Sequence, residues 1–126
     1  MLVSLISACN GEKDDYALRW IEEESKFVDC EITEDNFVIL RYSICFVNES
    51  EEDLSVSVSA RFNKKEIEGW IKYDFLEGLD ERGELLYADV KRGERVNVTY
   101  TFKAPYLGGK INESLSFPED VIIALM

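Results

Sequence analysis

The chain has 126 residues, of which 46% are hydrophobic, and a formal net charge of −12. This length corresponds to one globular domain that can fold without a metal or a disulfide. The acidic charge argues against binding to nucleic acid or to anionic lipid, whose phosphates would repel such a surface. The sequence has no histidine, which excludes Ser-His-Asp and Cys-His catalysis and His-ligated zinc.

The first nine residues form an apolar stretch that ends in Ile6-Ser7-Ala8-Cys9. This stretch resembles the lipobox of bacterial lipoproteins, in which an aliphatic residue and two small residues precede the cysteine that receives lipid. The resemblance implies cleavage before Cys9, lipidation of Cys9, and anchoring on the extracytoplasmic face of the cell membrane. Residues 1–9 are then expected to be the remnant of a lipoprotein signal, and the polar residues 10–15 are expected to be a tether.

The N-terminal stretch also departs from a secretory signal. Its apolar part has at most eight residues, and no lysine or arginine precedes it, whereas a signal has a basic start and an apolar run of about 7–15 residues. A true start upstream of Met1 would remove both defects. The alternative is an apolar N-terminus, or a first strand, that carries Cys9 by chance. In either case, no other segment approaches the roughly 18 apolar residues of a membrane span.

Residues 14–24 are expected to form a short helix or an irregular lead-in. Their apolar side chains recur with the spacing of one helical face. These side chains are Tyr16, Ala17, Trp20 and Ile21. An aspartate at the start of the segment is suited to cap the first turn.

From residue 27 onward, apolar and polar residues alternate with the period of two that is typical of half-buried strands. The predicted strands cover residues 28–32, 37–47, 54–62, 70–76, 85–90, 96–102 and 121–125. Residues 63–68 between two of these strands are expected to form a loop or a single turn. About seven strands with turn signals between them predict an all-β fold, an antiparallel two-sheet immunoglobulin-like sandwich, for the single domain 16–126. A small barrel is the competing architecture.

Residues 54–125 resemble a small sandwich domain that recurs in exported, uncharacterised bacterial lipoproteins. The segments that carry this likeness are Gly69-Trp70-Ile71, Leu85-Leu86-Tyr87 before Lys91-Arg92-Gly93-Glu94, and Tyr106-Leu107-Gly108-Gly109 before Leu115-Ser116-Phe117-Pro118. The hallmark Cys…Trp…Cys spacing of true immunoglobulin domains is absent, so the likeness is to an immunoglobulin-like fold. The resemblance implies a fold and export, and it assigns no catalytic residue.

The predicted strand 37–47 is apolar on both of its faces. Phe37, Ile39 and Val47 lie on the face opposite the main apolar row, and a strand of this kind is usually covered on both sides. The segment that contains Trp20 is one expected cover. The alternative is that Phe37, Ile39, Val47 and Trp20 form an interaction surface for a ligand or for a second copy in a homodimer.

Two cysteines, Cys30 and Cys45, remain if Cys9 is lipidated. An exported domain favours a disulfide between them. The alternation of the two strands instead places Cys30 on the apolar face and Cys45 on the face shared with Arg41, so that in a regular hairpin the thiols point to opposite sides. A β-bulge would remove this obstacle. Two buried or half-buried free thiols are therefore the expectation.

Carboxylates are plentiful, so a paired general acid and base is the first catalytic hypothesis. Asp74, Glu77, Asp80 and Glu84 surround one predicted turn, with aromatic residues nearby, as general acid–base cleavage of a sugar would require. A chain of this size has little room for a deep cleft, so a solvated acidic loop is the expected arrangement. We expect no catalytic residue and no cofactor.

Two acidic turns and three glycosylation triplets are further candidate sites. Residues 48–53 and 80–84 offer oxygen ligands for calcium, but neither matches an EF-hand loop, so no metal site is predicted. The triplets begin at Asn48, Asn97 and Asn112. Beside a bacterial type of N-terminus, they are expected to be ordinary polar residues of turns and strands.

The sequence thus predicts a non-enzymatic, lipid-anchored extracytoplasmic domain that binds or assembles at a bacterial envelope. Its partner would be a protein or an envelope ligand, and its only contact with the membrane would be the anchor at Cys9. The alternative is a small acidic cytoplasmic inhibitor, of the immunity-protein type, that neutralises a basic partner. Electrostatic steering would accelerate such an encounter.

Overall fold

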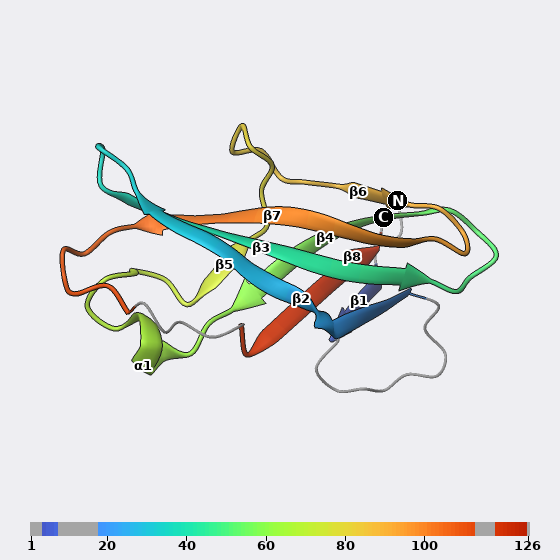
Figure 1. The fold of residues 1–126 in the computed structure, drawn as a ribbon, viewed down its shortest axis with the longest axis horizontal. Helices are drawn as coiled ribbons and strands as arrows, with labels where there is room; N and C mark the ends of the chain where they lie inside the picture. Colours follow the sequence, from blue (N-terminus) through green and yellow to red (C-terminus); the bar gives the residue numbers. More distant parts are fainter. Residues whose placement is uncertain (1–3, 8–17, 113–117, 126) are drawn as a thin grey trace.

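A computed structural model describes residues 4–7, 18–112 and 118–125 of the chain (Figure 1). The described part is dominated by strands, and its one helix, α1 (Lys64–Ile67), is a single turn at the place where the sequence predicts a loop or a turn. The strands are β1 (Ser4–Ser7), β2 (Leu18–Ile32), β3 (Phe37–Asn48), β4 (Leu54–Arg61), β5 (Phe75–Glu77), β6 (Ala88–Val90), β7 (Arg95–Pro105) and β8 (Asp120–Leu125).

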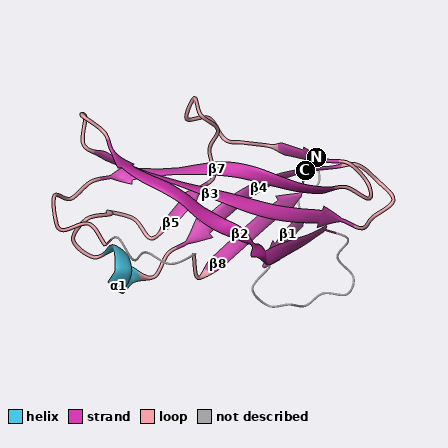
Figure 2. Cartoon of the chain, viewed as in Figure 1, coloured by secondary structure: helices cyan, strands magenta, loops and turns pink. Residues whose placement is uncertain are grey.

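The strands form two antiparallel sheets, which confirms the prediction of an all-β fold built from two such layers. One sheet has the order β1-β8-β4-β5, with β6 also pairing with β4, and the other has the order β2-β3-β7. The two sheets lie one over the other, with the long strands β2, β3 and β7 forming one layer (Figure 2). β2–β8 all lie within residues 16–126, the predicted domain.

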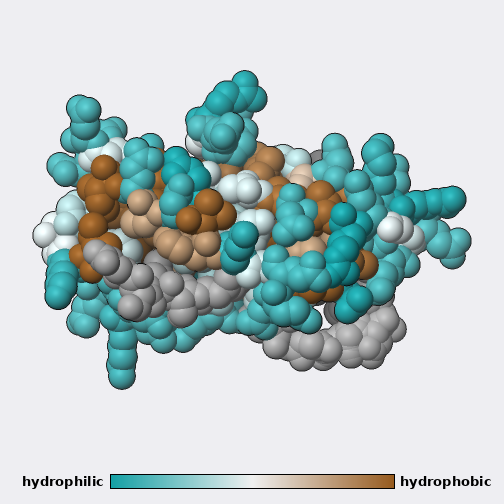
Figure 3. All heavy atoms as spheres, viewed as in Figure 1, coloured by the Kyte–Doolittle hydropathy of each residue, from teal (hydrophilic) through white to brown (hydrophobic). Residues whose placement is uncertain are grey.

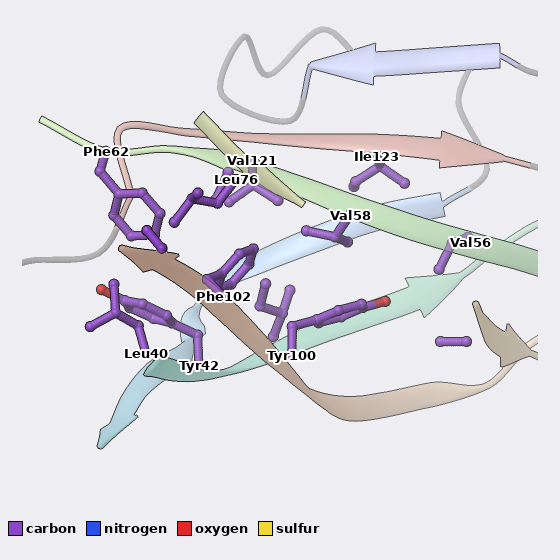
Figure 4. Close-up of a cluster of buried hydrophobic side chains, with 14 of the residues drawn as sticks. Leu40, Tyr42, Val56, Val58, Phe62, Leu76, Tyr100, Phe102, Val121 and Ile123 are labelled. Atoms are coloured by element: carbon purple, nitrogen blue, oxygen red, sulfur yellow. The ribbon is translucent and has the colours of Figure 1, made fainter. Parts of the chain in front are cut away.

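The core lies between the two sheets and is rich in aromatic rings. Alternate residues of β3, namely Val38, Leu40, Tyr42, Ile44 and Phe46, are almost fully buried there. The ring of Tyr42 packs edge-on against Phe102 at 5.9 Å between centroids, and Phe62 packs edge-on against the same ring at 5.8 Å (Figure 4). Burial of each such side chain stabilises the fold by about 1.5–3 kcal/mol.

The segment that follows β5 joins the two sheets through backbone hydrogen bonds. The amide of Gly78 donates to the carbonyl of Val58 in β4 at 2.6 Å. One residue later, Leu79 and Thr101 of β7 exchange hydrogen bonds of 2.7 and 2.9 Å. The chain therefore crosses from the edge of one sheet to the edge of the other at Gly78.

The helix predicted within residues 14–24 is wrong for its described part, since residues 18–24 belong to β2. Trp20 and Ile21 lie opposite Phe46 and Cys45 of β3, so they point to opposite faces of a sheet. Residues 18–21 pair with β3, and this pairing overrides a helical spacing of only two turns. Residues 14–17 lie outside the described part of the chain.

The strand predicted for residues 70–76 is also wrong over most of its length. Trp70 closes the turn that follows α1, where its amide donates to the carbonyl of Ile67 at 3.1 Å and its indole Nε1 donates to the carbonyl of Glu66 at 2.8 Å. Its ring is 1% exposed, so this is a buried anchor of a loop. The strand itself is confined to β5, and the next predicted strand is shortened to β6.

The N-terminal strand β1 pairs antiparallel with β8, with Leu5 opposite Ala124 and Ser7 opposite Ile122. These four residues lie within the segment 1–9 that resembles a lipoprotein signal, whereas Cys9 lies outside the described residues. A first strand in this place was the alternative that the sequence left open. Within the described residues, no helix has the length and apolar character needed to cross a membrane.

Candidate functional site

The side of the β2-β3-β7 sheet that faces away from the core, called here the outer face, contains three of the four predicted surface residues. Phe37, Ile39 and Val47 alternate with the core residues of β3 and are each half-buried. Apolar atoms gather on this side of the molecule at the end of the sheet where β3 begins (Figure 3). Trp20 lies opposite the buried Phe46 and packs against the core instead, so the structure does not bring it to this face.

Charged neighbours flank the two ends of this apolar row. At one end, the ammonium group of Lys103 lies 4.5 Å from the centroid of the Phe37 ring, a cation–π contact. At the other end, Val47 lies between Arg19 and Arg95, its partners in the neighbouring strands. Both arginines form ion pairs: Arg19 binds Glu49 at 3.0 Å, and Arg95 binds Glu24 of β2.

The middle of the outer face is covered by an irregularity in β2. Between Ile21 and Lys26, β2 advances five residues while β3 advances only two. The hydroxyl of Ser25 closes this bulge, because it accepts a hydrogen bond from the amide of Cys45 at 2.9 Å and donates to the carbonyl of Ile21 at 2.9 Å. Cys45 and its partner Ile21, which share the outer face, are both buried, so this part of the outer face is covered by the chain itself.

A hollow of about 200 Å³ lies on the outer face beside the turn formed by residues 79–83. Its base includes Ile39 and Thr101, and the turn rises along one side because Leu79 is bonded to β7. Three cationic side chains and two carboxylates share the lining. These are Arg41, Arg82, Lys103, Asp80 and Glu81.

The charges around the hollow are partly neutralised by fixed partners. The guanidinium of Arg41 donates to Asp29 at 2.8 Å and to Glu31 at 3.3 Å, and these contacts, that with Asp29 above all, raise its pKa. The carboxylate of Asp80 accepts backbone hydrogen bonds from Glu84 and Arg82, which lower its pKa. The carboxylate of Asp80 is thus occupied in shaping the turn. This arrangement suits non-covalent recognition of a mixed polar and apolar group.

The two cysteines in the described part are both free. Cys30 pairs with the buried Leu40 and points inward, whereas Cys45 pairs with Ile21 on the outer face, as the alternation of the strands predicts. Burial raises the pKa of both thiols, and Asp29 and Glu31 raise that of Cys30 further. A raised pKa keeps the thiols protonated and poorly nucleophilic, so neither provides a nucleophile for the hollow.

The acidic turns and the glycosylation triplets have structural roles where they are described. The side chain of Asn48 is fully buried, and its amide donates to the carbonyls of Val90 and Glu52 at 2.8 and 2.9 Å, so it is inaccessible to a glycan. Asn97 is exposed on the outer face of β7. Across the described residues, no group of three acidic or cysteine side chains is arranged to hold a metal.

The sequence predicted that Phe37, Ile39 and Val47 share one face, but it did not predict that the turn 79–83 forms one side of the hollow. The alternation of residues 96–102 extends to Lys103 and places it with Thr101 on the face shared by Arg41, so a local signal for three lining residues existed. The position of the turn 79–83 had no such signal. No protein-family model matches the chain, and no curated protein or solved structure matches it.

Proposed function

We propose that this chain is a non-enzymatic binding or assembly domain of a bacterial envelope, with an immunoglobulin-like sandwich as its recognition body. The observation that carries the proposal is the outer face of the β2-β3-β7 sheet, where Phe37 and Ile39 lie beside a hollow lined by Arg41, Thr101 and Lys103. A row of half-buried apolar side chains with a polar, charged rim has the composition of a protein-recognition surface.

The proposal includes anchoring through lipid on Cys9, with residues 10–15 as the tether. Its support is the run Ile6-Ser7-Ala8-Cys9, which resembles a lipobox. The test is metabolic labelling with a palmitate analogue in a bacterium that expresses the gene with its upstream codons. The parent chain should be labelled and Cys9→Ala should not. Equal labelling of both would show that the anchor is absent.

The recognition surface is tested separately by site-specific photocrosslinking in the same cells. A photoreactive residue at Ile39 should give a discrete adduct, because Ile39 lines the hollow. The matched control is Ser57, a half-buried strand residue that points outward from the other sheet. Adducts of equal yield at both positions, or none at Ile39, would contradict recognition by the outer face.

A cytoplasmic inhibitor that neutralises a basic partner is the second candidate. It is favoured by the net charge of −12 and by Glu22, Glu23 and Glu24, which are all exposed along the bulge of β2. Such charges would accelerate association with a basic protein. Cell fractionation separates the two candidates, because a lipid-anchored chain sediments with membranes and an inhibitor of this type stays in the soluble fraction. The codons upstream of Met1 give an independent answer.

A further inference from the structure

We infer that cleavage before Cys9 exposes the edge of β8, and that two processed copies pair through this edge to form a homodimer. The inference rests on the proposed lipid anchoring, because cleavage there would remove Ser4–Ser7, which is β1. In the described chain, β1 forms the antiparallel neighbour of β8 along residues 122–125. Its loss would leave the outward backbone groups of β8 without their partner, which is the template on which another strand can add.

The side chains of β8 favour pairing once the edge is exposed. Val121 and Ile123 are fully buried in the core, so the strand is held in register by its packing. Its other flank is fixed by pairing with β4. Its six residues include a single charge, Asp120, at one end. Proteins usually protect an exposed edge with charges, proline or bulges, and β8 has no such device along residues 121–125.

The edge strand of the other sheet gives a direct contrast. β2 contains seven charged residues and two shifts of register, between Ile21 and Lys26 and between Phe27 and Asp29. Both features discourage the addition of a further strand. Of these two edges, β8 is therefore the one suited to self-association.

A second copy of β8 fits this edge in one symmetric register. Antiparallel pairing centred on Ile123 places Val121 opposite Leu125 and Ile122 opposite Ala124 of the other copy. This register keeps inward residues opposite inward residues, so both cores stay continuous across the new pair. The two Asp120 carboxylates then lie at opposite ends of the interface. A two-fold dimer is also the commonest closed arrangement of identical chains.

Confinement to a membrane surface would favour a dimer whose interface is this short. A pair of six-residue strands buries less than the roughly 1,200 Å² of a typical stable interface, so dimers should dissociate in dilute solution. Lipid on Cys9 would confine the chains to a surface and raise their effective concentration. Pairing is therefore expected on vesicles at protein densities at which a detached chain is monomeric.

The test is crosslinking of the processed, lipidated protein on phosphatidylcholine vesicles. Ala124→Cys, treated with a short bismaleimide, should give a covalent dimer, whereas Thr99→Cys on the exposed side of β7 should give none above the level of the parent chain. The double variant Cys9→Ala with Ala124→Cys keeps β1 and should lose the dimer. Intact mass reports whether residues 1–8 were removed.

A second pair of variants probes the edge itself in the Ala124→Cys background. Ile122→Lys places a charge at the proposed seam and should abolish the dimer. Ser59→Lys, on the residue of β4 opposite Ile122 and one strand away from the seam, should leave the dimer intact. A cut and lipidated chain that does not crosslink, or a dimer that persists in Ile122→Lys, overturns the pairing alone. A chain that is not cut overturns both the pairing and the anchor.

Discussion

Gly78 lies directly against the ring of Tyr100, at the point where the chain crosses between the two sheets. A Cβ atom at residue 78 would lie 2.6 Å from Cδ1 of Tyr100 and 3.0 Å from the carbonyl oxygen of Val58. Real Cβ atoms essentially never come as close as 2.6 Å to another atom, and few come as close as 3.0 Å. The crossing therefore depends on a residue without a side chain, although the backbone of Gly78 does not have a positive φ.

We expect Gly78→Ala to destabilise the protein by about 1–3 kcal/mol, the usual cost of adding a methyl group to a filled core. Urea unfolding followed by tryptophan fluorescence would measure the loss. The control is the same substitution in a Tyr100→Leu background, where the cost should shrink because the ring has been removed. An equal cost in both backgrounds would assign the effect to Val58 or to the backbone instead.

The hydroxyl of Tyr100 is buried, and no described residue forms a hydrogen bond with it. An unsatisfied buried polar group costs free energy, so Tyr100→Phe should not lower the free energy of unfolding. We expect an increase of up to about 1 kcal/mol. Tyr106→Phe is the matched control, since it removes a hydrogen bond of 2.7 Å to the carbonyl of Gly109 and should lower stability. A loss in Tyr100→Phe similar to that in Tyr106→Phe would mean that the Tyr100 hydroxyl has a partner, such as a buried water.

The central strands were predictable because their alternation of apolar and polar residues matches the alternation of buried and exposed side chains. In β3, β4 and the second half of β7, each apolar residue of the period-two pattern points into the core, so a local pattern determines which face is buried. The face shared by Phe37, Ile39 and Val47 followed from the same parity. The alternation of β3 and β7 also places Arg41, Thr101 and Lys103 on one face.

The features that the sequence did not predict depend on contacts between distant segments. The bulge closed by Ser25 requires Cys45 as its partner, and no pattern within residues 18–32 reveals it. Trp70 is an apolar aromatic residue, a type that favours strands, but in the structure its indole Nε1 donates a hydrogen bond to the carbonyl of Glu66. The wall of the hollow exists because Leu79 bonds to Thr101. Each of these is a tertiary contact that overrides a weak local preference.

Stability should fall at alkaline pH because of two core tyrosines. Burial raises the pKa of both Tyr42 and Tyr100 well above the ordinary value near 10. Above about pH 10 their phenols ionise in the unfolded chain but stay neutral in the folded one, so the free energy of unfolding decreases as pH rises. Below that pH both states are neutral, and the contribution of these tyrosines is fully present.

The expected slope is about 1.4 kcal/mol per pH unit for each buried tyrosine. Urea titrations at a series of pH values above 10 would measure it. Tyr100→Phe should reduce the slope by one tyrosine's share, whereas Tyr73→Phe, at a side chain that is 49% exposed, should leave it unchanged. A slope that is the same in Tyr100→Phe as in the parent would show that Tyr100 ionises with its ordinary pKa in the folded protein.

Asn48 joins three segments at one end of the sandwich, and its loss should be costly. Its amide nitrogen donates to Val90 and Glu52, and its side-chain oxygen accepts the backbone amide of Ser50 at 2.9 Å. Asn48→Ala would leave the carbonyl of Val90 without this donor in a buried place, which should destabilise the protein by about 2–3 kcal/mol. Thermal or urea unfolding provides the measurement.

Asn97→Ala is the matched control for that prediction, because Asn97 also begins a glycosylation triplet but is exposed on β7. Its hydrogen bonds, to the carbonyl of Glu24 at 3.3 Å and to the hydroxyl of Ser43 at 3.4 Å, are long. We expect a change within about 0.5 kcal/mol, as for most surface substitutions. If the two alanine variants were equally stable, burial and hydrogen bonding of Asn48 would not hold the turn that follows β3, and the packing of Leu18 and Val90 around it would have to do so.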